Sequence, residues 1–268
     1  MKNSLITPAN FAATLALMTA LMAAPAAAQS EPKPGPYIGV SGGIALPGDS
    51  NNTGEFDAEV AATADFDAIP AGTELGWQTE NDNGFAISGQ FGYAFENGFR
   101  VELEGAYSEY DADTHRGLTV GGTDIDGIVS AVLTRAAADG ANPTVGAVLA
   151  DGHGGVKNFG LFGNVFYDIE TGSAIKPFVG AGVGYQWTEV NYSPSGVDVG
   201  DDDDGVLAYQ LMAGATAQIS ERAELFGQYT YRANAEDADI PLNLLPATLG
   251  VESDQSIVSA GIRFRFGG

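Results

Sequence analysis

Charged residues recur at alternate positions in segments that are otherwise apolar, and their spacing is the strongest indication of chemistry in the chain. In the run Arg100-Val-Glu-Leu-Glu104 every second side chain is charged. A strand directs alternate side chains to opposite faces, so such charges share one face. The spacing therefore predicts a network of arginine and glutamate side chains made of Arg100, Glu102, Glu104, Glu224, Arg232, Arg263 and Arg265.

A second candidate is the run of four aspartates Asp201, Asp202, Asp203 and Asp204. Carboxylate oxygens are the ligands that Ca²⁺ prefers, and glycines flank the run. The spacing is not that of an EF-hand loop, and a run of like charges is commonly a solvated segment. Calcium binding is one interpretation of the run, and a mobile acidic surface is the other.

Enzyme-like patterns are weak. Gly39-Val-Ser-Gly-Gly43 has the letters of a nucleophile elbow but lies within a predicted strand. Gly180-Ala-Gly-Val-Gly184 resembles a phosphate-binding loop, although no helix follows it. His115, beside Asp113, is the candidate for acyl-lipid chemistry, but no nucleophile and base accompany it. The sequence predicts no catalytic residues, and we expect that the protein is not an enzyme.

Eight alternating segments must position the charged side chains. In Phe85 to Phe95, large apolar residues such as Ile87 alternate with small or polar ones such as Ser88, which indicates a strand with two different faces. The segments lie at about 37–46, 84–95, 99–110, 157–168, 176–189, 206–219, 223–233 and 258–266. The fourth is the least regular, because Phe162 and Phe166 fall on its predicted inner face.

Short and long connections alternate strictly between these segments. Asn97-Gly98 is a hairpin signal, whereas the connections at about 47–83, 111–156, 190–205 and 234–255 are long. This asymmetry is typical of outer-membrane barrels, which have short periplasmic turns and long external loops. We predict an all-β, eight-stranded antiparallel up-and-down transmembrane barrel with its loops outside the cell and its termini in the periplasm.

A soluble lipocalin-like barrel is the alternative architecture. It would turn its large apolar residues inward and its polar residues outward. Aromatic residues near the predicted strand ends, such as Phe99 and Tyr107, favour a lipid-facing exterior, because aromatic rings collect at membrane interfaces.

The second long loop contains apolar residues at helical spacing, from Ile125 to Ala136. Thr123 and Asp126 match a capping box. We predict a short amphipathic helix from about Asp124 to Ala138, which would pack on the first loop or cover the barrel mouth.

The N-terminus and the composition indicate where the chain functions. A basic start, a short apolar stretch and Ala26-Ala27-Ala28 predict a signal peptide at residues 1–28, followed by a barrel domain at 29–268. The formal net charge is −24, and removal of Lys2 with the signal makes it −25. So acidic a chain will not bind nucleic acid by neutralising phosphates. The absence of cysteine excludes disulfides.

The inward charges have two interpretations. The interior of an eight-stranded barrel is just filled by side chains, and buried charges there must be paired. A structural network in a filled lumen is the first interpretation, and a small, weakly conducting pore is the second.

Five segments also carry a family resemblance. They are Pro36-Tyr-Ile-Gly-Val-Ser-Gly-Gly43, Phe99-Arg-Val-Glu-Leu-Glu-Gly105, Asn164-Val-Phe-Tyr-Asp168, Lys176-Pro-Phe-Val-Gly-Ala-Gly-Val-Gly-Tyr185 and Ser259-Ala-Gly-Ile-Arg-Phe-Arg-Phe266. In these strands, though not in its loops, the chain resembles the alphaproteobacterial outer-membrane surface-antigen family, whose barrels are OmpA-like and eight-stranded. The resemblance implies an abundant surface protein, with some members acting as pores or host-contact antigens. Such chains usually end on an aromatic residue, whereas here Phe266 is followed by two glycines.

Together these observations predict a monomeric integral outer-membrane surface protein of a Gram-negative bacterium, with a structural or surface-contact role. Its expected partners are outer-membrane lipid and a surface or host ligand of the acidic loops. We expect no cofactor apart from the candidate calcium. A small weakly conducting porin is the alternative, and a lipid-modifying barrel enzyme is a more distant one.

Overall fold

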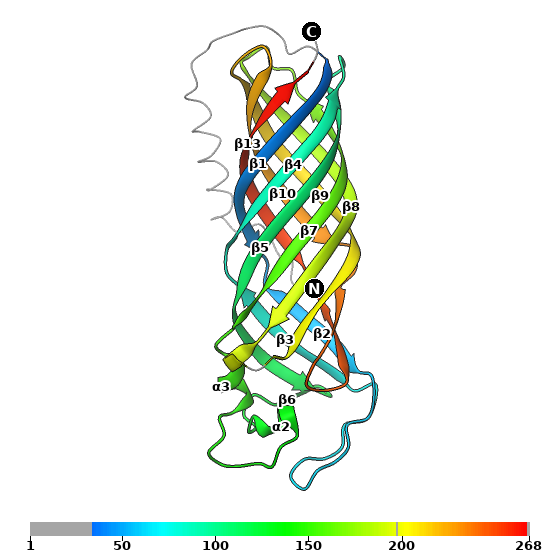
Figure 1. Cartoon of the computed structure of the whole chain (residues 1–268), viewed down its shortest axis with the longest axis vertical. Helices are drawn as coiled ribbons and strands as arrows, with labels where there is room; N and C mark the ends of the chain where they lie inside the picture. The colour runs from blue at the N-terminus through cyan, green and yellow to red at the C-terminus, as the bar shows by residue number, and fades with distance from the viewer. Residues whose placement is uncertain (1–33, 197, 267–268) are drawn as a thin grey trace.

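The computed structural model describes residues 34–196 and 198–266, and the predicted signal peptide lies outside this range. Eight antiparallel strands form a closed barrel, in which β5 pairs with β7 as well as with β4 (Figure 1). The order around the ring is β5, β4, β1, β13, β10, β9, β8, β7. The predicted barrel is confirmed, and each predicted segment overlaps one strand. The strands are β1 (Gly35–Pro47), β4 (Gly84–Ala94), β5 (Phe99–Val120), β7 (Gly154–Asp168), β8 (Ile175–Tyr192), β9 (Gly200–Gln218), β10 (Ala223–Asn234) and β13 (Asp254–Arg265).

The two ends of the barrel differ. The hairpins β4–β5, β7–β8 and β9–β10 lie at the end where β13 finishes, which we call the tight-turn end (Figure 1). At the β4–β5 hairpin Gly98 has a φ of +82°, a conformation that favours glycine. The opposite end, which we call the long-loop end, carries the remaining connections.

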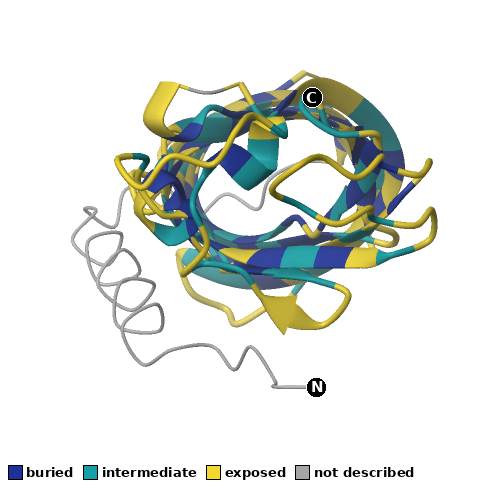
Figure 2. Cartoon of the chain, turned by 90° about the horizontal axis from the view of Figure 1, so that it is seen from below, coloured by how far each residue is buried: buried dark blue, intermediate teal, exposed yellow. Residues whose placement is uncertain are grey.

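Large apolar side chains point away from the barrel. Val183 is 71% exposed and Phe91 is 60% exposed, whereas the inward Gln186 and Gln210 are buried. Figure 2 shows this alternation along the strands of a closed ring, viewed from the long-loop end. A lipocalin-like barrel would have the reverse arrangement, so that alternative is wrong.

Outward aromatic rings pack in pairs near both ends of the barrel wall. Near the tight-turn end the ring centroids of Phe99 and Tyr167 are 5.1 Å apart. Toward the long-loop end the centroids of Phe159 and Trp187 are 5.7 Å apart. Two aromatic bands on either side of an apolar belt are typical of barrels that span a membrane.

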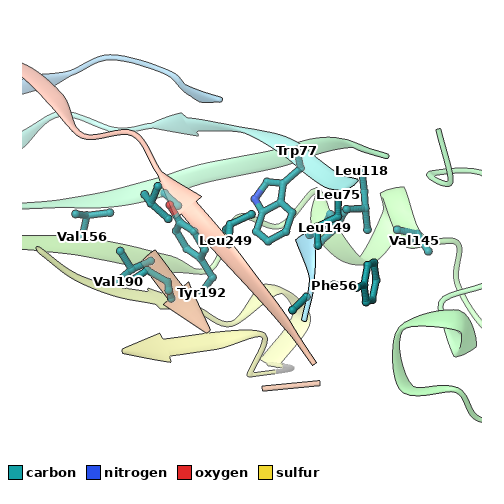
Figure 3. Packing of buried hydrophobic residues seen from close by; sticks show 14 of the residues in the cluster. Phe56, Leu75, Trp77, Leu118, Val145, Leu149, Val156, Val190, Tyr192 and Leu249 are labelled. Atoms are coloured by element: carbon teal, nitrogen blue, oxygen red, sulfur yellow. The ribbon is translucent and has the colours of Figure 1, made fainter. Parts of the chain in front are cut away.

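The first and last long connections fold into a second sheet, which the sequence reasoning did not predict. Its order is β5-β3-β2-β12-β11, so it extends the second half of β5 beyond the barrel. We call it the long-loop sheet. It buries Leu75, Trp77 and Leu249 against Tyr192 of β8, and a second, apolar core therefore lies beyond the polar lumen (Figure 3). Its strands are β2 (Ser50–Phe56), β3 (Glu74–Asn81), β11 (Ala238–Pro241) and β12 (Ala247–Val251), and the short β6 (Thr123–Asp124) also pairs with β5.

The helix predicted in the second loop, from about Asp124 to Ala138, is much shorter than expected. Asp126 does not cap a helix, because its carboxylate accepts hydrogen bonds from the backbone N–H groups of Gly117 and Leu118 at 2.9 and 3.0 Å. These bonds tie the segment to β5. Arg135, with a φ of +56°, ends the single helical turn that does form. The helices are α2 (Ala131–Thr134), α3 (Val145–Leu149) and the 3₁₀ turn η1 (Pro194–Gly196).

The apolar residues of this loop pack inward. Val132 and Leu133 of α2 lie against the core cluster that contains Phe56 and Val60 of the first loop. This is the packing role that the sequence pattern favoured. None of the helices in the described residues is long and apolar enough to cross a membrane.

Candidate functional site in the barrel lumen

The inward charges form two clusters, and the first crosses the middle of the lumen. Arg232 donates from Nη2 to Glu104 Oε1 over 3.2 Å and from Nε and Nη2 to Gln210 Oε1 over 3.0 and 2.7 Å. Asn164 and Gln210 donate to the second oxygen of Glu104 over 2.8 and 2.7 Å. All four side chains are buried. This mid-barrel cluster therefore joins β5, β7, β9 and β10 across the lumen.

The second cluster lies near the tight-turn end. Arg100 Nε donates to both carboxylate oxygens of Asp168, at 3.0 and 2.9 Å. The Tyr37 hydroxyl accepts from Arg100 Nη1 over 3.3 Å and donates to Glu102 Oε2 over 2.9 Å. We call this group, completed by Glu224, Arg263 and Arg265, the tight-turn cluster.

In the tight-turn cluster, Glu224 lies between two arginine side chains. Its two oxygens lie 3.3 Å from Arg263 Nη1 and 2.9 Å from Arg265 Nη2. Because the seventh and eighth predicted strands are neighbours, the sequence predicts that Arg232, like Glu224, meets Arg263 or Arg265, and for Arg232 this prediction is wrong. In the register of β10 and β13, Glu224 is opposite Arg263, whereas Arg232 is opposite Gln255. Arg232 therefore reaches Glu104 instead.

Positive and negative groups balance in the two clusters. Four guanidinium groups are matched by the carboxylates of Glu102, Glu104, Glu224 and Asp168. A buried charge without a partner would cost several kcal/mol. The lumen is thus electrically neutral, although the whole chain carries a formal charge of −24.

Four members of the clusters were missed by the sequence reasoning. Asn164 and Gln210 are uncharged, while Tyr37 and Asp168 lie at the ends of predicted strands. Each of the four lies on the inward parity of its strand, so parity alone could have identified them.

Aromatic rings explain the irregular fourth segment. Phe162 and Phe166 point into the lumen and are almost completely buried. The guanidinium carbon of Arg232 lies 4.3 Å from the ring centroid of Phe162, and that of Arg100 lies 4.4 Å from Phe166. Arg263 stacks similarly on Phe226, at 4.8 Å. These cation–π contacts add an attraction to each buried arginine that the ion pairs do not supply.

Glycine makes room for the inward rings. A Cβ atom at Gly180 would lie 2.3 Å from Cδ1 of Phe166. The motif Gly180-Ala-Gly-Val-Gly184 lies entirely in β8. The glycines of this motif therefore make room in the lumen and do not bind phosphate.

Two spaces border the clusters. A polar void of about 20 Å³ lies beside Ser41, Ser88, Glu104 and Arg232, enough for about one water molecule. A wider opening of about 300 Å³ lies at the tight-turn end, beside Lys176 and the tight-turn cluster.

His115 does not pair with its sequence neighbour Asp113. A β-bulge opposite Glu80 and Asn81 leaves Asp113 exposed while His115 is buried. His115 Nδ1 is hydrogen-bonded to the Thr79 hydroxyl at 2.8 Å. The acyl-lipid candidate therefore lacks an aspartate–histidine pair in the described residues.

The aspartates of the candidate calcium site lie in β9, opposite residues 188–191 of β8. Asp202 and Asp204 accept hydrogen bonds from the backbone N–H groups that directly follow them. Because an extended strand directs successive side chains to opposite faces, the four carboxylates do not converge. In the part of the chain that the structure describes, no three or more His, Cys, Asp or Glu side chains are placed so that they could hold a metal ion together.

Comparisons with known proteins agree with this geometry. A sequence model described as "Surface antigen" matches residues 55–267. A protein named "Outer membrane protein" from Gluconacetobacter diazotrophicus is 30% identical over 251 residues, which cover 89% of this chain and 57% of the relative. The chain thus spans little more than half the length of this relative.

Among solved structures, the outer membrane protein OprG from Pseudomonas aeruginosa has the same fold. The TM-score is 0.51 with 18% identity, covering 88% of this chain and 98% of that protein. Neisserial surface protein A gives a TM-score of 0.42 with 14% identity, covering 86% and 97%.

Proposed function

This chain belongs to the surface-antigen family of outer-membrane proteins, and from that premise we propose that it acts in envelope structure and surface contact through a non-conducting barrel. The observation that carries the proposal is the filled lumen. Two neutral clusters and four stacked aromatic rings occupy the interior. The void beside the mid-barrel cluster, at about 20 Å³, is too small for a column of water.

The proposed orientation places the long-loop end outside the cell and both termini in the periplasm. Short turns at one end and long connections at the other support it. The first long connection contains nine Asp and Glu residues and neither Lys nor Arg. The long-loop end therefore offers an acidic surface to a cell-surface or host ligand, while outer-membrane lipid covers the apolar belt. The protein functions as a monomer and does not bind nucleic acid.

Single-channel recording tests the central claim. The refolded protein and the variant Arg263→Ala are inserted into a planar bilayer at equal concentration. We expect no conductance steps from the wild type, because the two clusters leave no continuous path. A variant that lacks the long-loop sheet tests whether the loops alone block the barrel, and it should also show no conductance steps. Regular conductance steps from the wild type would refute the proposal.

A small pore is the second candidate. The opening of about 300 Å³ at the tight-turn end supports it, because water in that space would bring ions to the edge of the tight-turn cluster. In this function Arg263→Ala would raise a conductance that is already measurable in the wild type.

We further propose that the protein is not an enzyme. His115 is buried against Thr79, and His153 is exposed with Nδ1 3.6 Å from Asp151. Mass analysis of lipid A from cells with and without the protein tests this. A change in acyl-chain number that depends on the protein would restore the enzyme hypothesis.

A further inference from the structure

The long-loop end contains a cavity that the proposed surface role does not use. Its volume is about 70 Å³. Trp77 contributes to its wall from β3, His115 and Leu118 from β5, Leu149 from α3, and Tyr192 from β8. In Figure 3 Trp77 lies between Tyr192 and Leu249 on one side and Leu75, Leu118 and Leu149 on the other.

The wall is almost entirely apolar and carries no charged side chain. Trp77, His115 and Tyr192 form a cluster of three rings, with centroid separations of 6.5, 6.4 and 4.7 Å. Burial lowers the pKa of His115 to about 4, so the imidazole is neutral at pH 7. A charged ligand would lose its hydration in this cavity and gain no ion pair.

Two polar atoms of the aromatic cluster lie behind the apolar surface of the cavity. Nε1 of Trp77 and Nε2 of His115 have no hydrogen-bond partner within the described residues, although both side chains are more than nine-tenths buried. These nitrogens contribute almost no surface to the cavity, so a ligand would contact the apolar parts of the rings and the surrounding aliphatic side chains.

Size and position restrict the occupant. An engineered apolar cavity of about 150 Å³ in another protein binds benzene, and the present cavity has about half that volume. It therefore suits a molecule smaller than benzene rather than a peptide strand or a second copy. The rim is made of half-buried aliphatic side chains, among them Val132, Leu133 and Leu242. The polar mid-barrel cluster lies between the cavity and the tight-turn end, and it offers an apolar molecule no path along the barrel axis.

We propose that this cavity binds a small, uncharged, apolar molecule that enters at the long-loop end. The site holds its ligand by contact with the aromatic cluster and with the surrounding leucines. Binding there is independent of conductance and of lipid chemistry, so the proposal can fail or succeed separately from the proposed function.

The chain supplies its own reporter for a binding experiment, because its two tryptophans lie in different places. Trp77 lines the cavity, whereas Trp187 is 41% exposed on the lipid-facing wall. In full-length Trp187→Phe, reconstituted in lipid nanodiscs, chloroform is titrated as a compact apolar quencher of indole fluorescence. We expect quenching of Trp77 that saturates. In Trp77→Phe the remaining Trp187 should show only a linear response to chloroform dissolved in lipid.

Two further variants test whether the cavity is the site. In the Trp187→Phe background, Leu133→Phe fills the cavity and should raise the dissociation constant by roughly tenfold or more. Leu161→Phe is the matched control on the lipid-facing wall, where Leu161 is 46% exposed, and should leave binding unchanged.

If Leu133→Phe does not fold, Leu133→Ala provides the test, because the enlarged cavity should admit iodobenzene with saturable quenching. Linear quenching of equal slope in both single-tryptophan proteins would overturn the proposal. Saturable quenching that Leu133→Phe leaves intact would also overturn it, as would linear iodobenzene quenching in Leu133→Ala.

Discussion

Replacing Arg232 with methionine should destabilise the barrel far more than breaking an ion pair on its surface, even one with a shorter N–O distance. The substitution removes the ion pair with Glu104 at 3.2 Å, two bonds to Gln210 and the stack on Phe162. Glu104 keeps its bonds from Asn164 and Gln210 but becomes a buried charge without a counterion. Loss of one partner of a buried pair costs about 3–5 kcal/mol.

The double variant Glu104→Gln/Arg232→Met separates the charge from the packing. Both charges are then absent and the side-chain volumes are nearly preserved, so most of the loss should be recovered. We expect the double variant to lie within about 1–2 kcal/mol of the wild type. The two single variants and the double variant complete a thermodynamic cycle, whose coupling energy measures the interaction within the cluster.

The assay is urea unfolding in phospholipid vesicles, followed by tryptophan fluorescence and by the gel shift on boiling. The control is Lys157→Met, which breaks the pair with Glu189 at 2.8 Å, where both side chains are about half exposed. Because exposed pairs contribute little, the control should be hard to distinguish from the wild type. The mid-barrel cluster does not stabilise the barrel as argued if Arg232→Met unfolds at the same urea concentration as the wild type. The same holds if the double variant is as unstable as Arg232→Met.

Three other predictions follow from the same structure. Gly180→Ala should lower the temperature of the gel-mobility shift, because the new Cβ meets the Phe166 ring, and an unchanged temperature would contradict the packing argument. His115, with a pKa of about 4 when folded and about 6.5 when unfolded, binds fewer protons in the folded state. The free energy of unfolding of the long-loop sheet should therefore be greatest above about pH 6.5 and fall by up to about 3 kcal/mol toward pH 4. Protease resistance should fall with it, and His115→Gln should show no such fall. Millimolar calcium should leave the thermal stability unchanged, because Asp201–Asp204 do not converge, and stabilisation that is absent in a variant with four asparagines would show a site there.

The barrel could be predicted from the sequence because each wall strand has two different environments, with lipid on one face and the polar lumen on the other. Apolar and polar or small residues therefore alternate along segments such as residues 84–95. This alternation shows which residues of a strand face the lipid and which face the lumen. The inward position of Glu224 followed from the same parity. Its partners also followed, since neighbouring strands at the chain end place it opposite Arg263.

The long-loop sheet could not be predicted in this way. Its strands are short, and β2 reads Ser-Asn-Asn-Thr-Gly-Glu-Phe, in which only Phe56 is apolar. Pairings such as Phe56 with Ala247 join residues almost two hundred positions apart, and no local pattern encodes them. In the second loop, helical spacing is present from Ile125 onward, but the hydrogen bonds that the Asp126 carboxylate accepts from the backbone of β5 outweigh it. Arg232 was misplaced because its partner depends on the width of the barrel, which parity does not give.

The pairing of β1 with β13 also has a kinetic consequence. The barrel closes between the first and last strands of the described chain, in a register that matches Tyr37 with Arg265. The long-loop sheet, which stays open, also joins the two ends of the described chain, through the pairing of β2 with β12. Contacts of such sequence separation form slowly, because most of the chain must be ordered before they can be made. The barrel therefore remains open until β13 pairs, and a chain truncated before β13 would leave the edges of β1 and β10 unpaired in lipid, where an open edge is not tolerated.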